Sequence, residues 1–142
     1  QSLAVSQILG NLIDQNLRNL FEGGIGLFSV TLGFGDPAAD AGTSVVQWEA
    51  TVPLTILGVQ FSVATKAATS AVFDLFKADG TTSILSAAIT ITADSTTTKG
   101  VISTSSKNYY NMDVGDKIKT KLTQNGANNT KGAQAILLCQ RR

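Results

Sequence analysis

The side chains that most often perform catalysis are few in this sequence and lie far apart. Its 142 residues contain no histidine, which removes the usual general base, the partner of a serine or cysteine nucleophile, and the commonest zinc ligand. The carboxylates are scattered singly, without the spacing of a glycosidase pair. Gly23, Gly24 and Gly26 precede a predicted strand, which is the wrong context for a phosphate-binding loop. The sequence therefore predicts a protein that is not an enzyme and has no cofactor.

Two isolated features have ordinary explanations. Asp36 and Asp40 share a loop, but calcium takes six or more oxygen ligands and this loop offers two carboxylates. We therefore predict no metal site. Cys139 is the single cysteine, so no intrachain disulfide can form. We expect it to be a small buried residue of the last strand, not a reactive thiol.

Two groups of residues could contact a partner. Lys117, Lys119 and Lys121 alternate along one predicted strand. We interpret them as a solvated face that discourages edge-to-edge aggregation, and contact with an acidic protein surface is the alternative. Tyr109 and Tyr110 could stack on sugar rings, although buried or subunit-facing tyrosines are as common.

Composition narrows the classes of partner. The net charge is +1 and charged residues make up 15% of the chain, so nucleic acid is not an expected partner. Sparse charge also suggests a surface covered by copies of the chain or by another protein. No apolar run is long enough to span a membrane. Since the chain starts at Gln1, we expect proteolytic processing or a fragment of a longer product.

Residues 2–21 differ from the rest of the chain and predict an amphipathic helix. Apolar residues recur there at spacings of three and four, namely Ile8, Leu9, Leu12, Ile13, Leu17, Leu20 and Phe21. The sequence leaves open whether this helix covers the end of the following domain or docks on another subunit. We predict an N-terminal helix or arm at residues 1–24 and a β-sandwich at residues 25–142.

From residue 26 on, apolar residues recur at every second position, as in strands with one buried face. The predicted faces are Phe28, Val30, Leu32 and Phe34; Val46, Trp48, Ala50 and Val52; Leu57, Val59, Phe61 and Val63; Phe73 and Leu75; Leu85, Ala87, Ile89 and Ile91; Ile118, Thr120 and Leu122; and Leu137 and Cys139. A short strand is expected near Val101 and Ile102, and a turn at residues 108–115. We predict an all-β fold, an antiparallel sandwich of about eight strands, jelly-roll-like.

Residues 56–85 form the centre of this predicted fold. One strand leads through a small-residue loop to a second strand that is apolar on both sides, which indicates a central strand or one covered by a subunit. Asp79-Gly80 then supplies a turn. The outward apolar residues predict a subunit interface, and they are Val72, Phe76, Ile136 and Leu138.

The succession FSVATKAATSAVFDLFKADGTTSIL, a Thr-rich segment and VGDKIKTKLTQNG resembles β-sandwich modules of tailed-phage structural proteins. Such modules occur in capsid decoration (cement) proteins, head fibres and tail-associated fibres. The resemblance covers residues 56–138. It implies a non-enzymatic virion component, commonly trimeric, whose N-terminal segment attaches it to the particle.

Our first hypothesis is a capsid decoration protein on the virion surface that binds the major capsid protein, stabilises the assembled shell and forms a homotrimer. Attachment or subunit packing is assigned to the apolar helix residues Leu9, Leu12, Ile13, Leu17 and Leu20. The alternative is a head- or tail-fibre module that binds a glycan receptor through Tyr109, Tyr110 and the loops at residues 36–43 and 124–131. A TNF-like or adhesion ligand is a third possibility, disfavoured by the lack of disulfides and of a secretion signal.

Overall fold

The computed structural model describes residues 5, 7–14, 26–35, 43–65, 69–92, 97–103, 109–125 and 130–142. Val5 and residues 7–14 are helical, and nine strands follow in the described part of the chain. The strands are β1 (Leu27–Gly35), β2 (Thr43–Glu49), β3 (Leu54–Ser62), β4 (Ser70–Lys77), β5 (Ile89–Thr92), β6 (Thr97–Gly100), β7 (Tyr110–Met112), β8 (Lys117–Asn125) and β9 (Ala133–Arg141).

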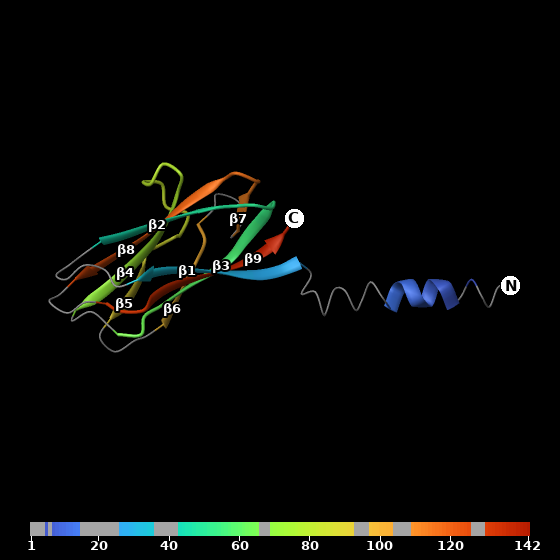
Figure 1. Ribbon diagram of the computed structural model, residues 1–142, viewed down its shortest axis with the longest axis horizontal. Coiled ribbons are helices and arrows are strands. Elements are labelled where there is room, and N and C mark those ends of the chain that lie inside the picture. The colour runs from blue at the N-terminus through green and yellow to red at the C-terminus, as the bar shows by residue number, and fades with distance from the viewer. Residues whose placement is uncertain are drawn as a thin grey trace.

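The strands form two antiparallel sheets that pack as a sandwich (Figure 1). One sheet has five strands in the order β1-β9-β3-β6, with the short β7 also paired to β3. The other has four strands in the order β2-β8-β4-β5. The chain switches repeatedly between the sheets, and its first and last strands are neighbours. This is the strand order of a jelly roll, which confirms the predicted fold.

The predicted centre of the fold supplies an inner strand to each sheet. β3 lies between β9 and β6 in the five-stranded sheet, and β4 lies between β8 and β5 in the four-stranded sheet. Phe73 and Leu75 on the inner face of β4 are buried, whereas Val72 and Phe76 on its outer face are half-buried.

Three aromatic rings join the two sheets at the core. Phe61 of β3 stacks on Phe73 of β4 across the interior, with ring centroids 5.1 Å apart and planes at 23°. Phe34 of β1 meets both rings edge-on, at 5.9 Å from Phe73 and 6.4 Å from Phe61. Such geometries add to the free energy of burial. The other fully buried large side chains include Leu54, Ile56, Leu75, Ile84, Ile91, Met112, Ile118, Leu122 and Leu137.

The turn after β4 forms as predicted. Gly80 has φ 73°, in the region that glycine adopts without strain, and its N–H donates to the Lys77 carbonyl at 2.9 Å. The Asp79 carboxylate accepts hydrogen bonds from the backbone N–H groups of Thr81 and Thr82 at 2.9 and 2.8 Å. The Thr82 hydroxyl donates to the other carboxylate oxygen, Oδ2. This side-chain hydrogen bond, together with the two backbone hydrogen bonds, stabilises the ionised form and lowers the pKa of Asp79 to about 2.

The predicted face of β3 is wrong at Leu57. The pairing of β3 with β9 shifts between Ile56 and Gly58, so the bulge moves Leu57 off the inward row. Ile56 and Val59 are buried on either side of it, whereas Leu57 is half-buried on the outer face. A bulge of this kind inverts the alternation by one residue.

Three predictions for the middle of the chain are also wrong. Residues 110–112 form strand β7 instead of part of a turn. The expected strand around Val101 lies earlier, at β6, and only Ile102 makes an isolated bridge, with Leu85. Ala87 is exposed because regular pairing of this segment begins only at Ile89.

Candidate interaction surfaces

The described helical segment buries none of its apolar side chains in the sandwich. They recur at spacings of three and four and are more than half exposed: Val5 58%, Ile8 60%, Leu9 54%, Leu12 52% and Ile13 59%. The helix lies apart from the sandwich, beyond the start of β1 (Figure 1). The other two predicted attachment residues, Leu17 and Leu20, lie outside the described residues. This helix face is thus an apolar surface that the described residues of the sandwich leave uncovered.

The four residues of the predicted subunit interface lie on two different outer faces. Val72 and Phe76 belong to β4, on the outer face of the four-stranded sheet. Ile136 and Leu138 belong to β9, on the outer face of the five-stranded sheet. Because the two sheets pack through their inner faces, these pairs are on opposite sides of the sandwich and cannot form one continuous patch.

The outer face of the four-stranded sheet is charged. Lys117, Lys119 and Lys121 of β8 all point outward, alternating with buried Ile118, Thr120 and Leu122. Two of the lysines lie opposite an acidic residue on a neighbouring strand.

Lys117 is paired in register with Glu49 of β2, and Lys121 with Asp74 of β4. Opposite charges at paired positions stabilise a sheet modestly. The lysines do form a solvated face, but β8 lies between β2 and β4. The proposed protection against edge aggregation is therefore wrong, since β8 has no free edge.

The outer face of the five-stranded sheet carries no charged side chain on β1, β3, β7 and β9. Its outward positions are Leu27, Ser29, Thr31 and Gly33 on β1; Thr55, Leu57, Gly58, Gln60 and Ser62 on β3; Asn111 on β7; and Gln134, Ile136, Leu138 and Gln140 on β9. Covering uncharged polar and apolar side chains with another protein costs less desolvation free energy than covering the lysines of the other face.

A shallow groove of about 470 Å³ crosses the middle of this uncharged face. Its apolar lining includes Leu57, Val59, Ile136 and Leu138, and Ser29 and Gln60 contribute polar atoms. Gly58 is the Cα partner of Leu138, and no atom lies within 4 Å of where a side chain would begin there. The missing side chain leaves the groove open above β3.

A second depression, of about 430 Å³, adjoins the first at Leu57. It is lined by Thr55, Tyr109, Asn111, Gln140 and Arg142 in addition to Leu57. One aromatic ring beside hydroxyl, amide and guanidinium groups is a set that suits a polar ligand such as a sugar.

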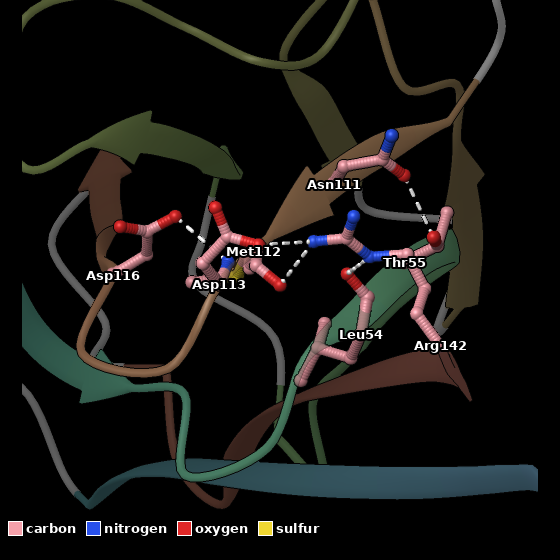
Figure 2. Close-up of polar contacts among 7 residues, drawn as sticks. All are labelled: Leu54, Thr55, Asn111, Met112, Asp113, Asp116 and Arg142. Carbon is pink, nitrogen blue, oxygen red and sulfur yellow. Dashed lines mark hydrogen bonds and ion pairs between the residues drawn. The ribbon is translucent and has the colours of Figure 1, made fainter.

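Hydrogen bonds hold the polar side chains of this depression in place (Figure 2). The Arg142 guanidinium donates from Nη2 to the Met112 carbonyl at 2.8 Å and to Asp113 Oδ1 at 2.7 Å, and from Nε to the Leu54 carbonyl at 3.3 Å. The Thr55 hydroxyl donates to Asn111 Oδ1 at 2.7 Å. The C-terminal residue thereby ties β3 to β7 and to the turn after β7.

The two adjacent tyrosines have different environments. Tyr109 is 49% exposed and lines the second depression. Tyr110 is half-buried and packs against the core. Burial raises the pKa of Tyr110, and the negative charges of Asp116 and Asp79 raise it further. Only Tyr109 is therefore placed to meet a ligand.

Cys139 is fully buried, as predicted, and burial raises the pKa of its thiol to about 11. Asp36 and Asp40 lie outside the described residues, as do residues 36–42 and 126–129 of the two loops predicted to bind a glycan. Among the residues that the structure describes, no three histidine, cysteine or acidic side chains come together as metal ligands. No described helix is long and apolar enough to cross a membrane.

The sequence pattern does not identify Leu57, Thr55, Asn111 and Arg142 as residues that line a surface depression. The bulge at Leu57 has no reliable sequence pattern, although Gly58 next to it is a signal that could reveal it. The remaining three come together only through the pairing of β7 and β9 with β3.

The sequence matches no protein family and no curated protein. Solved structures with some likeness are infectious bursal disease virus Gx strain, at 14% identity and TM-score 0.39, and the VP2 subviral particle of infectious bursal disease virus, at 12% and 0.33. A third is the T=1 particle derived from infectious bursal virus, at 13% and 0.28.

The alignments cover 81%, 81% and 82% of this chain but 32%, 33% and 36% of the others, so the chain spans about a third of their length. Likenesses this low identify neither a family nor a function.

Proposed function

We propose that this chain is a structural protein of a virion, a capsid decoration or cement protein that binds the major capsid protein and stabilises the assembled shell. The observation that carries the proposal is the helix near the N-terminus, whose five apolar side chains are all more than half exposed. A face of that kind on a small jelly roll calls for a protein partner, since leaving it in water forgoes its hydrophobic stabilisation.

Three further features support this function. The outer face of the five-stranded sheet carries no charged side chain on β1, β3, β7 and β9, which suits close packing beside other proteins. Jelly rolls are common in viral capsid and lectin domains, an argument by analogy of fold only. The sequence also resembles phage decoration and fibre modules.

The proposed mechanism is thermodynamic. A subunit that binds only the assembled shell shifts the equilibrium toward assembly by mass action, and it does so most strongly where it bridges neighbouring capsomers. A trimer presents three attachment surfaces at once, so moderate contacts add up to tight binding. No catalysis is assigned.

The test is co-sedimentation of the purified chain with shells that lack it, together with the melting temperature of those shells. Saturable binding in fixed ratio to the major shell protein, with a raised shell melting temperature, is the expected result. Leu9→Asp with Leu12→Asp should abolish binding, and Val45→Asp on the lysine-bearing face serves as the control. A shell that neither binds the chain nor gains stability would rule the function out.

A glycan-binding fibre module is the second candidate, and the depression beside Tyr109 favours it. Stacking of a sugar ring on Tyr109, with hydrogen bonds to Asn111 and Gln140, would be the mode of binding. Purified host envelope glycans should then bind saturably, and Tyr109→Ala should abolish this binding while Tyr110→Phe leaves it intact. Absence of saturable binding would eliminate this candidate.

A further inference from the structure

Two apolar surfaces are exposed on the described part of the chain, one on the helix and one on the sandwich. On the helix, Val5, Ile8, Leu9, Leu12 and Ile13 form one continuous stripe, while Gln7, Gly10, Asn11 and Asp14 occupy the opposite side. On the sandwich, the groove lined by Leu57, Ile136 and Leu138 is a concave apolar strip. An amphipathic helix that lays its apolar face in an apolar groove is a common mode of protein recognition.

We propose that the N-terminal helix of a second copy of this chain docks in the groove on the outer face of the five-stranded sheet. Each copy then donates one helix and receives one. The described helix lies apart from the sandwich (Figure 1), and its apolar side chains are exposed. Every copy carries one helix and one groove, so a second copy provides one groove for each helix.

Charge selects this face over the other. Docking an apolar helix against the four-stranded sheet would strip water from Lys119 and Lys121 without supplying new partners, which is costly. No charged side chain lines the groove on the five-stranded sheet. The described helix itself carries one charged side chain, Asp14, on its polar side.

The path of the chain also suits exchange between copies. β1 starts at Leu27, whose side chain is 42% exposed on the same outer face as the groove. The chain between Asp14 and Gly26 can span at most about 40 Å when fully extended, enough to reach a neighbouring sandwich. Two copies can exchange helices reciprocally around a two-fold axis, and three or more can pass them around a ring, so either closed arrangement pairs every helix with a groove.

The decisive experiment uses single-cysteine exchange. Two full-length variants, Leu12→Cys and Leu138→Cys, are mixed and treated with a short bismaleimide cross-linker. Native Cys139 is buried, and its raised pKa disfavours the reactive thiolate. Matched controls are Gln7→Cys on the polar side of the helix, and Val45→Cys, which is 59% exposed on the other outer face.

Mixing Leu12→Cys with Leu138→Cys should give a cross-linked dimer that peptide mapping assigns to those two positions. Replacing Leu12→Cys by Gln7→Cys, or Leu138→Cys by Val45→Cys, should give several-fold less cross-linked dimer. Absence of the mixed product overturns the proposal. A double variant that instead cross-links within one chain would assign the helix to its own groove and equally overturn it.

The mass of the full chain in solution gives a second, independent readout. Wild type should be a closed oligomer by light scattering, and Leu138→Asp or Leu12→Asp should weaken association about tenfold or more, as expected for one leucine lost from an apolar contact. Val45→Asp should leave the mass unchanged. A wild-type chain that is monomeric at high concentration would refute the proposal.

This inference assigns to a second copy the same helix stripe that the proposed function assigns to the shell, and two outcomes tell the assignments apart. A monomer that still binds and stabilises shells would overturn the inference alone, and the helix would then contact the shell directly. An oligomer that forms as described but binds no shell would overturn the proposed function alone.

Discussion

Removing residues 1–24 should leave the sandwich as stable as the full chain when both are monomeric. Val5, Ile8, Leu9, Leu12 and Ile13 are each more than half exposed, so their deletion takes no apolar area out of the core. We expect the free energy of unfolding to change by less than about 1 kcal/mol, the range typical of surface changes.

If the helix packed on the sandwich, removing it would lower the free energy of unfolding far more. Full burial of an aliphatic side chain contributes roughly 1.5–3 kcal/mol, so five such residues packed on the sandwich would contribute roughly 8–15 kcal/mol. That is comparable with the entire stability of a typical domain, about 5–15 kcal/mol. A truncated chain would then be unfolded or nearly so.

The assay is guanidinium unfolding of the full and truncated chains, followed by tryptophan fluorescence of Trp48, over a series of protein concentrations. At the lowest concentrations the two curves should coincide. At higher concentrations the full chain should become more stable, because subunit association is linked to folding, whereas the truncated chain should not change. A loss above about 3 kcal/mol at low concentration would refute the assignment of the helix as an arm outside the core.

Three further predictions concern the sandwich. Phe73→Ala should lower the free energy of unfolding by about 3–5 kcal/mol, because it empties the ring stack between the sheets, and a loss below about 1 kcal/mol in denaturant unfolding would contradict that packing. Asp79→Asn should destabilise the chain at neutral pH, because the folded-state pKa of Asp79 is lowered from 3.8 to about 2. The stabilisation by this carboxylate is present above pH 3.8 and is lost as the pH falls toward 2, so the melting temperatures of wild type and variant should converge there; a constant difference would contradict it. Cys139 should resist alkylation by iodoacetamide at pH 8 in the folded chain and react on unfolding, and rapid reaction of the native protein would contradict its burial.

Much of the fold could be predicted because its strands alternate regularly. Phe73 and Leu75, Ile118 and Leu122, and Leu137 and Cys139 are all buried as expected. In each of these strands, every second side chain points inward, because successive side chains of a strand point to opposite faces. Cys139 follows the same alternation and is buried, and its burial raises the pKa of its thiol.

The errors have local causes that a periodicity cannot reveal. The bulge between Ile56 and Gly58 reverses the face of Leu57. Tyr110 and Met112 are inward residues of a strand too short to show an alternation. Ala87 was included because it fits the period, yet pairing begins only at Ile89.

The candidate surfaces depended on information that only the sheet topology provides. Val72 and Leu138 looked equivalent as outward apolar residues, and they lie on opposite faces of the sandwich. Arg142 lines a depression for two reasons. β9 pairs with β3, and the Arg142 guanidinium donates to the Met112 carbonyl of β7. The helix face, in contrast, was evident from spacing, and its exposure is what gives it functional meaning.

The central claim is that this chain is a virion decoration protein, and its copy number in purified particles tests that claim most directly. Quantitative mass spectrometry of virions, measured against the major shell protein, should find this chain in a fixed stoichiometric ratio to the shell. A few copies per particle would contradict decoration and favour the fibre alternative, and absence from the particle would contradict any virion role.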